Sequence, residues 1–303
     1  MHPDPTIVLG SAGVGLLVGM TGAGGGALMT PMLILLFGVK PSAAISSDLV
    51  AAVLMRPFGA AVHLRRGTVN LGLVGWLVVG SVPTAFLGAW LLHLLGYSSG
   101  AQANVERALG SALLLGAAAM VVRLRLDRRR GLRRDASVGD LELRPLPTVA
   151  VGIAGGLIVG MTSVGSGSLM IVLLLCLYPT ISANRIVGTD LTQAVPLTLA
   201  AALGALAFGH VELPVTTSIV LGSIPAVLIG SLLSSRAPEQ WLRPAITFVI
   251  FASGLKYVGV PTVALGWVAG VGLVLGVFLV VRSRRKQVPA GELSLAAGPR
   301  TSV

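Results

Sequence analysis

Charge is scarce in this sequence, and the stretches without it are long. Asp, Glu, Lys and Arg make up only 11% of the 303 residues, whereas hydrophobic residues make up 54% and the mean hydropathy is +0.90. Stretches such as 71–95, 109–122 and 264–281 contain no charged side chain. About 18 or more apolar residues are enough to cross a bilayer core of roughly 30 Å. The composition therefore predicts an integral membrane protein.

The residues that enzymes and metal proteins need are also scarce. Cys176 is the only cysteine, which excludes a disulfide framework and a thiolate metal site. The sequence has no HExxH motif, no cluster of Cys and His, no pair of candidate catalytic carboxylates and no ATP-binding loop. We therefore predict neither an enzyme nor a cofactor, and transport would draw on an ion gradient or on the substrate's own gradient. The amino terminus has no basic segment, so no cleavable signal peptide is predicted.

The net charge of +11 is concentrated in two basic runs. These are Arg123–Arg134 and Arg282–Lys286, and each directly follows an apolar stretch. Basic residues in such positions mark the cytoplasmic face of a membrane protein and contact anionic lipid. The charge therefore predicts membrane lipid, rather than nucleic acid, as the partner of these runs.

One unusual segment occurs twice. Residues 15–29 read GLLVGMTGAGGGALM and residues 156–170 read GLIVGMTSVGSGSLM, with ten identities in fifteen positions at an offset of 141. Further matches follow nearly in step, between 47–49 and 189–191 and between 80–83 and 222–225. A duplicated apolar unit that is broken by glycines is typical of secondary transporters, whose site lies where the broken segments meet.

Glycine, proline and charge divide the chain into two repeats, 1–122 and 148–258, joined by a basic cytoplasmic linker at 123–147. Each repeat begins with a glycine-broken segment, at 6–37 or 148–178, and continues with three candidate spans. An extra span within 259–281 and a disordered basic tail at 282–303 follow. The candidate spans are 43–64, 71–95, 105–122, 184–208, 214–235, 241–258 and 262–281.

The broken segments allow two topologies. If they cross the membrane, the Lys and Arg residues outside the core divide 11 to 10 between the two faces. If they are re-entrant, the division is 18 to 3, with only Lys40, Arg107 and Lys256 on the sparse face. The positive-inside rule favours the uneven division. We therefore predict an all-α polytopic protein with two inverted repeats, seven full spans and two re-entrant hairpins.

The two glycine clusters, 22–26 and 163–167, are poor helix formers, because each glycine costs about 1 kcal/mol relative to alanine. Non-helical backbone at membrane depth survives only where it is buried in protein or lines a polar cavity. A half-helix N-terminus there offers N–H donors and partial positive charge, which suit an anion. Close helix packing explains one cluster alone, whereas two clusters at matched positions favour a binding site.

Ionisable residues within apolar spans are candidates for function. Asp48 and Asp190 occupy matched positions, where they either cap helices or carry a coupling proton or cation. Arg56 follows Asp48 by roughly 12 Å of helix; its guanidinium either holds a sulfite or sulfonate through paired hydrogen bonds or pairs with an aspartate. His63, near a cytoplasmic helix end, is either a proton relay or an ordinary surface histidine.

Several of these motifs resemble the sulfite exporter TauE/SafE family over about Val8–Val258. They are the doubled GMTGAGGG and GMTSVGSG, the SSDL and GTDL that follow, GAAVHLRRGTVN, and the GSVP and GSIP stretches. The resemblance implies transport of sulfite, small organosulfonates or other small anions across the bacterial inner membrane. It points to Gly24–Gly26, Asp48, His63, Gly165, Gly167 and Asp190. Asn70 and Glu212 stand where the family often has aspartate.

We predict a multi-pass secondary transporter, an exporter of small anions, in which two opposed glycine hairpins form the site and one repeat moves against the other. A passive anion channel, a membrane-embedded enzyme and an enzyme's anchoring subunit are the alternatives. The expected partners are the anion, a coupling proton or cation, lipid and a second copy of the chain. The predicted substrate-binding residues are Thr21, Gly24, Gly25, Gly26, Arg56, Thr162, Ser163, Gly165, Ser166, Gly167 and Gln193. Asp48, Asp190 and His63 are predicted to have coupling or structural roles.

Overall fold

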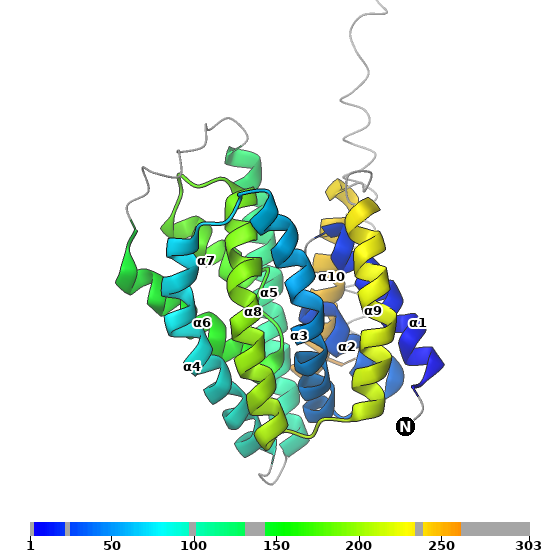
Figure 1. Ribbon diagram of the computed structural model, residues 1–303. Coiled ribbons are helices and arrows are strands. Elements are labelled where there is room, and N and C mark those ends of the chain that lie inside the picture. The colour runs from blue at the N-terminus through cyan, green and yellow to red at the C-terminus, as the bar shows by residue number, and fades with distance from the viewer. Residues whose placement is uncertain (1–2, 22–24, 97–100, 131–142, 234–238, 262–303) are drawn as a thin grey trace, which may run out of the picture. The chain divides into compact units, whose positions relative to one another are not determined.

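The computed structural model describes residues 3–21, 25–96, 101–130, 143–233 and 239–261. In these ranges the chain forms ten α-helices and no strand (Figure 1), which confirms the predicted all-α fold. The helices are α1 (Pro5–Thr21), α2 (Gly26–Phe37), α3 (Pro41–Arg65), α4 (Leu71–Gly96), α5 (Ala101–Arg130), α6 (Pro145–Thr162), α7 (Leu169–Leu177), α8 (Ala183–Phe208), α9 (Leu213–Leu233) and α10 (Glu239–Tyr257). The predicted span at 262–281 and the tail at 282–303 lie outside the described residues.

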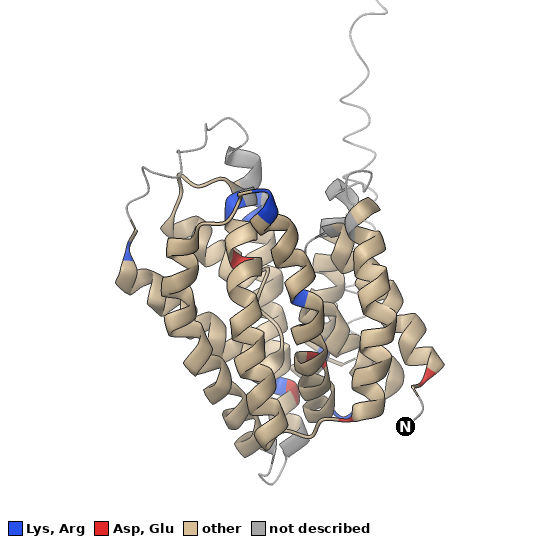
Figure 2. Ribbon diagram, in the orientation of Figure 1, with Lys and Arg blue, Asp and Glu red and all other residues tan. Residues whose placement is uncertain are grey.

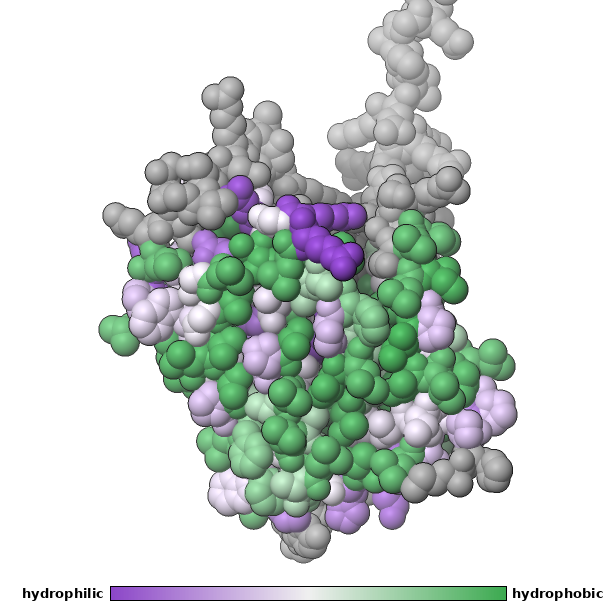
Figure 3. Space-filling model, viewed as in Figure 1, coloured by the Kyte–Doolittle hydropathy of each residue, from purple (hydrophilic) through white to green (hydrophobic). Residues whose placement is uncertain are grey.

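The helices present apolar side chains to their surroundings. Six of them, α3, α4, α5, α6, α8 and α9, contain segments long and apolar enough to cross a membrane, while α1, α2 and α10 contain shorter apolar segments. Leu9, Leu36 and Leu232 are 74%, 74% and 79% exposed. Figure 3 shows hydrophobic residues over most of one face, and Figure 2 shows basic residues gathered where α3 ends. Helices that are apolar on all sides suit lipid, so this is a multi-pass membrane protein.

Each glycine-broken segment folds into a hairpin of two helices. In the first hairpin, α2 runs back along α1, so that a Cβ added to Gly10 would lie 2.8 Å from the Phe37 ring. In the second, α7 runs back along α6, and the Tyr178 hydroxyl lies 2.6 Å from Thr148 Oγ1 at the outer ends of the two helices. In each hairpin, the beginning of the first helix and the end of the second helix therefore lie close together.

The first helix of each hairpin packs against a distant helix, α1 along α9 and α6 along α4, and these are the most extensive helix contacts in the described chain. A Cβ on Gly222 would overlap the carbonyl oxygen of Val8, and one on Gly80 would overlap that of Val149. In each pair the same contact recurs between a glycine eight residues later in one helix and a residue eight residues later in the other. The contacts therefore advance in the same direction along both helices, and the paired helices run parallel. Small residues allow such close backbone approach in membranes.

The two hairpins enter the bundle from opposite ends. Helix α3 begins beside the open end of the first hairpin, because α2 ends at Phe37 and α3 starts at Pro41. Helix α4 begins at the far end of α3, and α6 runs parallel to α4, so the second hairpin enters from that far end. Helices α3 and α8 pack against each other between the hairpins.

Two interhelical turns are fastened to distant hydroxyl groups in the same manner. The N–H of Asn70, between α3 and α4, donates to Thr189 Oγ1 at 3.1 Å. The N–H of Glu212, between α8 and α9, donates to Ser47 Oγ, also at 3.1 Å. In each case the acceptor immediately precedes a buried aspartate, so the turns and the aspartate-bearing helices hold one another in register.

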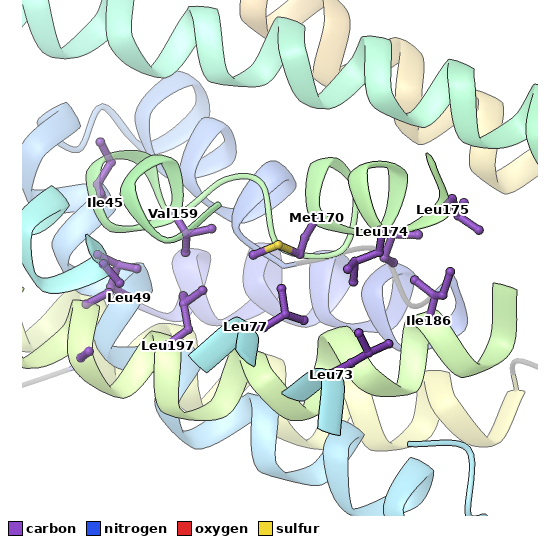
Figure 4. Packing of buried hydrophobic residues seen from close by; sticks show 14 of the residues in the cluster. Ile45, Leu49, Leu73, Leu77, Val159, Met170, Leu174, Leu175, Ile186 and Leu197 are labelled. Carbon is purple, nitrogen blue, oxygen red and sulfur yellow. The ribbon is translucent and has the colours of Figure 1, made fainter. Parts of the chain in front are cut away.

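Apolar packing fixes the second hairpin against α3, α4 and α8. Figure 4 shows this cluster from close by, with side chains from five helices interlocking. Lipid tails are as apolar as the side chains of these helices, so the hydrophobic effect contributes little to helix association within a membrane. Helices in membranes therefore associate mainly through close van der Waals contact. The labelled residues, none more than 1% exposed, are Ile45, Leu49, Leu73, Leu77, Val159, Met170, Leu174, Leu175, Ile186 and Leu197.

Candidate anion site at the hairpin tips

The second glycine cluster forms a buried loop, residues 163–168, between α6 and α7. Ser163 has φ +58°, and its N–H donates to the Val159 carbonyl oxygen at 2.7 Å, which ends α6. Gly165 and Gly167 have φ +121° and +89°, values that side chains other than glycine rarely adopt. The Gly165 carbonyl oxygen accepts the N–H groups of the first two residues of α7. Positive φ at these positions is the local reason for the break.

The first glycine cluster is described only at its end. Gly25 is helical, with φ −55° and ψ −40°, and its carbonyl oxygen accepts bonds from Leu28 and Met29 at the start of α2. The backbone of Thr21 ends α1. Gly24, a predicted binding residue, lies outside the described residues.

The two hairpin tips touch each other. A Cβ added to Gly26 would overlap the Ser163 carbonyl oxygen and would lie 2.7 Å from both the Ser163 carbonyl carbon and its Oγ. No residue larger than glycine fits between α2 and the second loop without a shift. The structure thus brings together two of the predicted binding residues that are 137 positions apart in the sequence.

Asp48 lies directly beside this contact. Its side chain is 2% exposed, and its Oδ2 accepts hydrogen bonds from Ser163 Oγ at 2.7 Å and from Thr30 Oγ1 at 2.9 Å. Asp48 therefore connects α3 to both hairpins. It does not cap its own helix, because α3 begins at Pro41 with Lys40 as its N-cap. The capping interpretation of this residue is wrong.

Asp190 occupies a corresponding place on α8 but has different partners. Its side chain is 1% exposed; Oδ2 accepts the Gly167 N–H at 2.8 Å and Oδ1 accepts Gln193 Nε2 at 3.1 Å. Gln193 Oε1 in turn accepts a bond from Ser81 Oγ at 3.2 Å. Asp190 is not the N-cap of α8, which is Ser182, yet it satisfies an N–H in the loop before α7.

Arg123 is a site residue that the sequence did not reveal, since it is the first residue of a basic run expected on the cytoplasmic face. Helix α5 continues into this run as far as Arg130, and Arg123 is buried, at 6% exposure. One guanidinium nitrogen donates to the Gly167 carbonyl oxygen at 3.2 Å. Gly116, seven residues earlier and so on the same side of α5, faces Ser168. The seven-residue spacing between Gly116 and Arg123 was the feature of the sequence that could have indicated that Arg123 faces the loop.

Arg56 is half-buried on α3, within electrostatic reach of both Asp190 and Asp48. Among the described residues it has no hydrogen bond and no carboxylate within 4.0 Å, so a direct ion pair with an aspartate is not formed. The matched residue on α8, Thr198, donates to the carbonyl of Ala194 in its own helix. At this pair of matched positions, only the first half of the chain therefore has a guanidinium group.

The hydroxyl groups of the second loop divide into two classes. Thr162 Oγ1 donates to the Ile158 carbonyl oxygen at 2.6 Å, so this predicted binding group is engaged within its own helix. Ser166 Oγ and Ser168 Oγ are buried and have no hydrogen-bond partner among the described residues. Buried hydroxyls normally have a partner, so these two are the loop groups best placed to receive a ligand.

His63 does not belong to the tips. Its Nδ1 lies 2.9 Å from Thr68 Oγ1 at the far end of α3, some 15 residues or roughly 22 Å of helix from Asp48. A Cβ on Gly188 would come within 3.0 Å of Nδ1, so the ring is packed against the start of α8. In the described part of the chain, no group of three or more His, Cys, Asp or Glu could hold a metal ion.

Comparison with known proteins agrees with this architecture. The family model described as "Sulfite exporter TauE/SafE" matches residues 7–257. The "Probable membrane transporter protein YjnA" of Bacillus subtilis is 41% identical over 254 residues, which cover 84% of this chain and 99% of that protein. The "Probable membrane transporter protein YdhB" of the same organism is 26% identical over 251 residues, or 80% and 95% of the two chains. No solved structure matches the chain.

Proposed function

Because this chain belongs to the sulfite exporter TauE/SafE family, we propose that it is a secondary transporter that exports small anions, such as sulfite or organosulfonates, across the plasma membrane. That it is a membrane transporter follows from the family and the curated relatives. The anion, the direction and the mode of transport are the proposal.

The meeting of the two hairpin tips carries the proposal of an anion site. Gly26 and Ser163 abut between α3 and α8, at the depth where Asp48 and Asp190 are buried. The hydroxyl groups of Ser166 and Ser168 provide donors that no described residue uses. Arg123 and Arg56 bring two positive charges to the same region, and guanidinium groups match the oxygens of sulfite and sulfonates. Donors, positive charge and glycine backbone are what a small oxyanion requires.

We also propose that the two halves are inverted repeats. The matched segments are repeated in sequence, and their contacts correspond: α1 against α9 resembles α6 against α4, and the Asn70–Thr189 bond resembles the Glu212–Ser47 bond. The two hairpins enter from opposite ends of α3, which is the relation that inverted repeats require.

The same packing suggests which parts move. Each hairpin packs on a helix of the other half through backbone contact, so the halves cannot separate as units. We propose instead that two rigid bodies move against each other. One body consists of α1–α3, α9 and α10, and the other consists of α4–α8. They meet where α3 packs on α8 and α5 on α10, and the turns near Asn70 and Glu212 connect them. This arrangement replaces the expected movement of one sequence repeat against the other.

Two engineered disulfides test these bodies in a chain whose single cysteine is replaced by serine. A Cβ on Gly204 would lie 2.7 Å from Ala89 Cβ within one body, and a Cβ on Gly110 would lie 2.9 Å from Tyr257 Cβ between the bodies. Both pairs need a similar small shift to reach the usual separation of about 3.8 Å. Oxidation of G110C/Y257C should stop transport reversibly, whereas oxidation of A89C/G204C should leave it intact. The opposite pattern would contradict the proposed bodies.

Counterflow in proteoliposomes tests the transport function. Purified protein should exchange labelled sulfite for unlabelled sulfite with saturable kinetics, and ethanesulfonate, thiosulfate, sulfate and acetate serve as competitors. Ser166→Ala should weaken apparent affinity several-fold, because one hydrogen bond contributes about 0.5–1.5 kcal/mol. Cys176→Ser, at an exposed position on α7, is the control and should change nothing. Unitary currents in planar bilayers, or flux that does not saturate, would instead indicate a channel.

A further inference from the structure

The two buried carboxylates at the hairpin tips receive hydrogen bonds from different kinds of donor. Asp48 receives both of its described bonds from hydroxyl groups, those of Thr30 and Ser163. Asp190 receives its bonds from a backbone N–H and from an amide. We propose that Asp48 binds and releases a proton that travels with the anion, while Asp190 stays ionised throughout. This inference rests on the proposed anion transport and adds the coupling ion and the residue that carries it.

The hydroxyl partners of Asp48 suit both of its protonation states. A hydroxyl donates to a carboxylate and accepts from a carboxylic acid, because its hydrogen can rotate. Thr162 and Thr198 each donate to the carbonyl four residues earlier in their helices. Thr30 can do the same within α2 when protonated Asp48 donates to it. Ser163 Oγ can likewise accept. Neither state of Asp48 is left without a partner.

The partners of Asp190 suit only the ionised state. The Gly167 N–H can donate but cannot accept. The carbonyl of the same residue accepts a bond from Arg123, so the guanidinium and the carboxylate bind the same residue. Ser81 Oγ donates to Gln193 Oε1, which keeps the Nε2 group of Gln193 directed at Asp190. A proton on Asp190 would weaken these bonds and remove a negative charge that interacts with Arg123.

The charges around the tips balance only when both aspartates are ionised. The charge that acts on Asp48 is that of Arg56 on its own helix, which acts on Asp190 of α8 as well. Arg123 of α5 acts on Asp190. Helices α2 and α9 and loop 163–168, as far as they are described, bring no titratable side chain there. Two aspartates and two arginines sum to zero, so a bound anion would add an unbalanced charge.

Protonation of Asp48 changes this sum to +1, which a monovalent anion returns to zero. Unbalanced charge inside a membrane protein is costly, so the proton and the anion favour each other's binding. By linkage, the anion raises proton affinity by the same factor as the proton raises anion affinity. The loaded carrier is then neutral at its tips and crosses without moving net charge. Export proceeds whenever the product of anion and proton concentrations is larger inside.

Gradient-driven uptake into proteoliposomes tests the assignment, with whichever of sulfite and ethanesulfonate shows counterflow as the probe. A pH gradient of about 2 units, acid outside, allows up to about 100-fold accumulation when one proton accompanies one anion, since each unit is a tenfold ratio. Wild type should accumulate the anion and take up protons, measured with an entrapped pH dye. Asp48→Asn, which is fixed in the neutral state, should lose accumulation and proton uptake, and any counterflow that it shows should no longer vary with pH. Protons that the anion itself binds contribute equally to the wild type and to the variant, so the difference between the two reports the proton carried by Asp48.

Asp190→Asn is the matched control, and it should lose counterflow as well as accumulation. Thr30→Val keeps the shape of the side chain and removes one donor to ionised Asp48, so it should move the midpoint for anion binding to higher pH. This midpoint is measured even if Asp48→Asn fails to fold. Counterflow without accumulation or proton uptake in wild type would overturn the assignment and leave anion transport standing. Accumulation by Asp48→Asn, or an unmoved midpoint in Thr30→Val, would also overturn it. Absence of all counterflow would refute anion transport itself.

Discussion

Replacing Gly26 by alanine adds one methyl group where the two hairpin tips touch. The new Cβ would lie 2.7 Å from the Ser163 carbonyl carbon and closer still to its oxygen. Carbon atoms in good contact are about 3.5–4.0 Å apart, so the tips must separate by ~1 Å. Neither neighbour is the flexible end of a long side chain. The shift therefore falls on the backbone of α2 or of the second loop.

The cost follows from that separation. Overpacking of a well-packed interior costs about 1–3 kcal/mol. Moving Ser163 by ~1 Å also lengthens its 2.7 Å bond to Asp48 beyond the usual O–H···O range, and a hydrogen bond to a charged group is worth about 1.5–3 kcal/mol. Alanine regains about 1 kcal/mol of helix propensity at the start of α2. We expect Gly26→Ala to lower the free energy of unfolding by about 2–4 kcal/mol.

The neighbouring glycine provides a matched control. A Cβ on Gly25 would meet only the methyl group of Met55, at 3.9 Å, and Gly25 already has helical φ and ψ. Thermal unfolding in detergent, followed for both alanine variants, should show a lower Tm for Gly26→Ala only. Counterflow should fall in the same variant, because Asp48 loses a partner. Equal stability and transport of the two variants would refute the tip-to-tip contact.

Three further predictions concern the arginines. Arg123→Gln should destabilise the protein by about 2 kcal/mol, because it removes a charged donor from the Gly167 carbonyl, whereas Arg125→Gln, on the exposed side of α5, should stay within about 0.5 kcal/mol; equal melting curves would contradict this. Arg56→Lys should weaken anion affinity several-fold and Arg56→Gln more, with little change in Tm since Arg56 has no direct ion pair in the described structure; unchanged affinity in both would exclude it from the site. Single cysteines at Arg66 and Arg185 in a cysteine-free background should both be labelled from the cytoplasmic face, and labelling from opposite faces would contradict the inverted topology.

Sequence patterns were sufficient to predict where the helices lie and where the glycine-broken segments are interrupted. The predicted span at 71–95 became α4, and the interruption expected near Gly165 is a loop whose positive φ values require glycine. Local features decide these outcomes, because apolar length and glycine backbone freedom are properties of short segments. The main local difference is α5, which continues to Arg130, eight residues beyond its predicted end, because arginines are good helix formers.

The partners of the site residues were not predictable from the sequence. Asp48 and Ser163 are 115 residues apart, and nothing within either segment indicates that they meet. The matched positions of Asp48 and Asp190 did not indicate whether their roles are the same; in the fold, one has hydroxyl donors and the other has N–H donors. Such differences depend on which loop each helix faces after folding. The burial of Arg123 has the same cause, since composition marks it as a surface residue and only the fold places it against Gly167.

The crossed packing of α1 on α9 has a consequence for biosynthesis. Gly15 of α1 lies against Ser223 of α9, so a helix made among the first must wait for one made about 200 residues later. At about 5–20 residues per second, that interval is roughly 10–40 s. During it, the glycine-lined surface of α1 has no native helix to cover it. A ribosome that stalls after the first half should thus leave an inserted chain that is open to quality-control proteases, and the carboxy-terminal half supplied as a separate polypeptide should protect it.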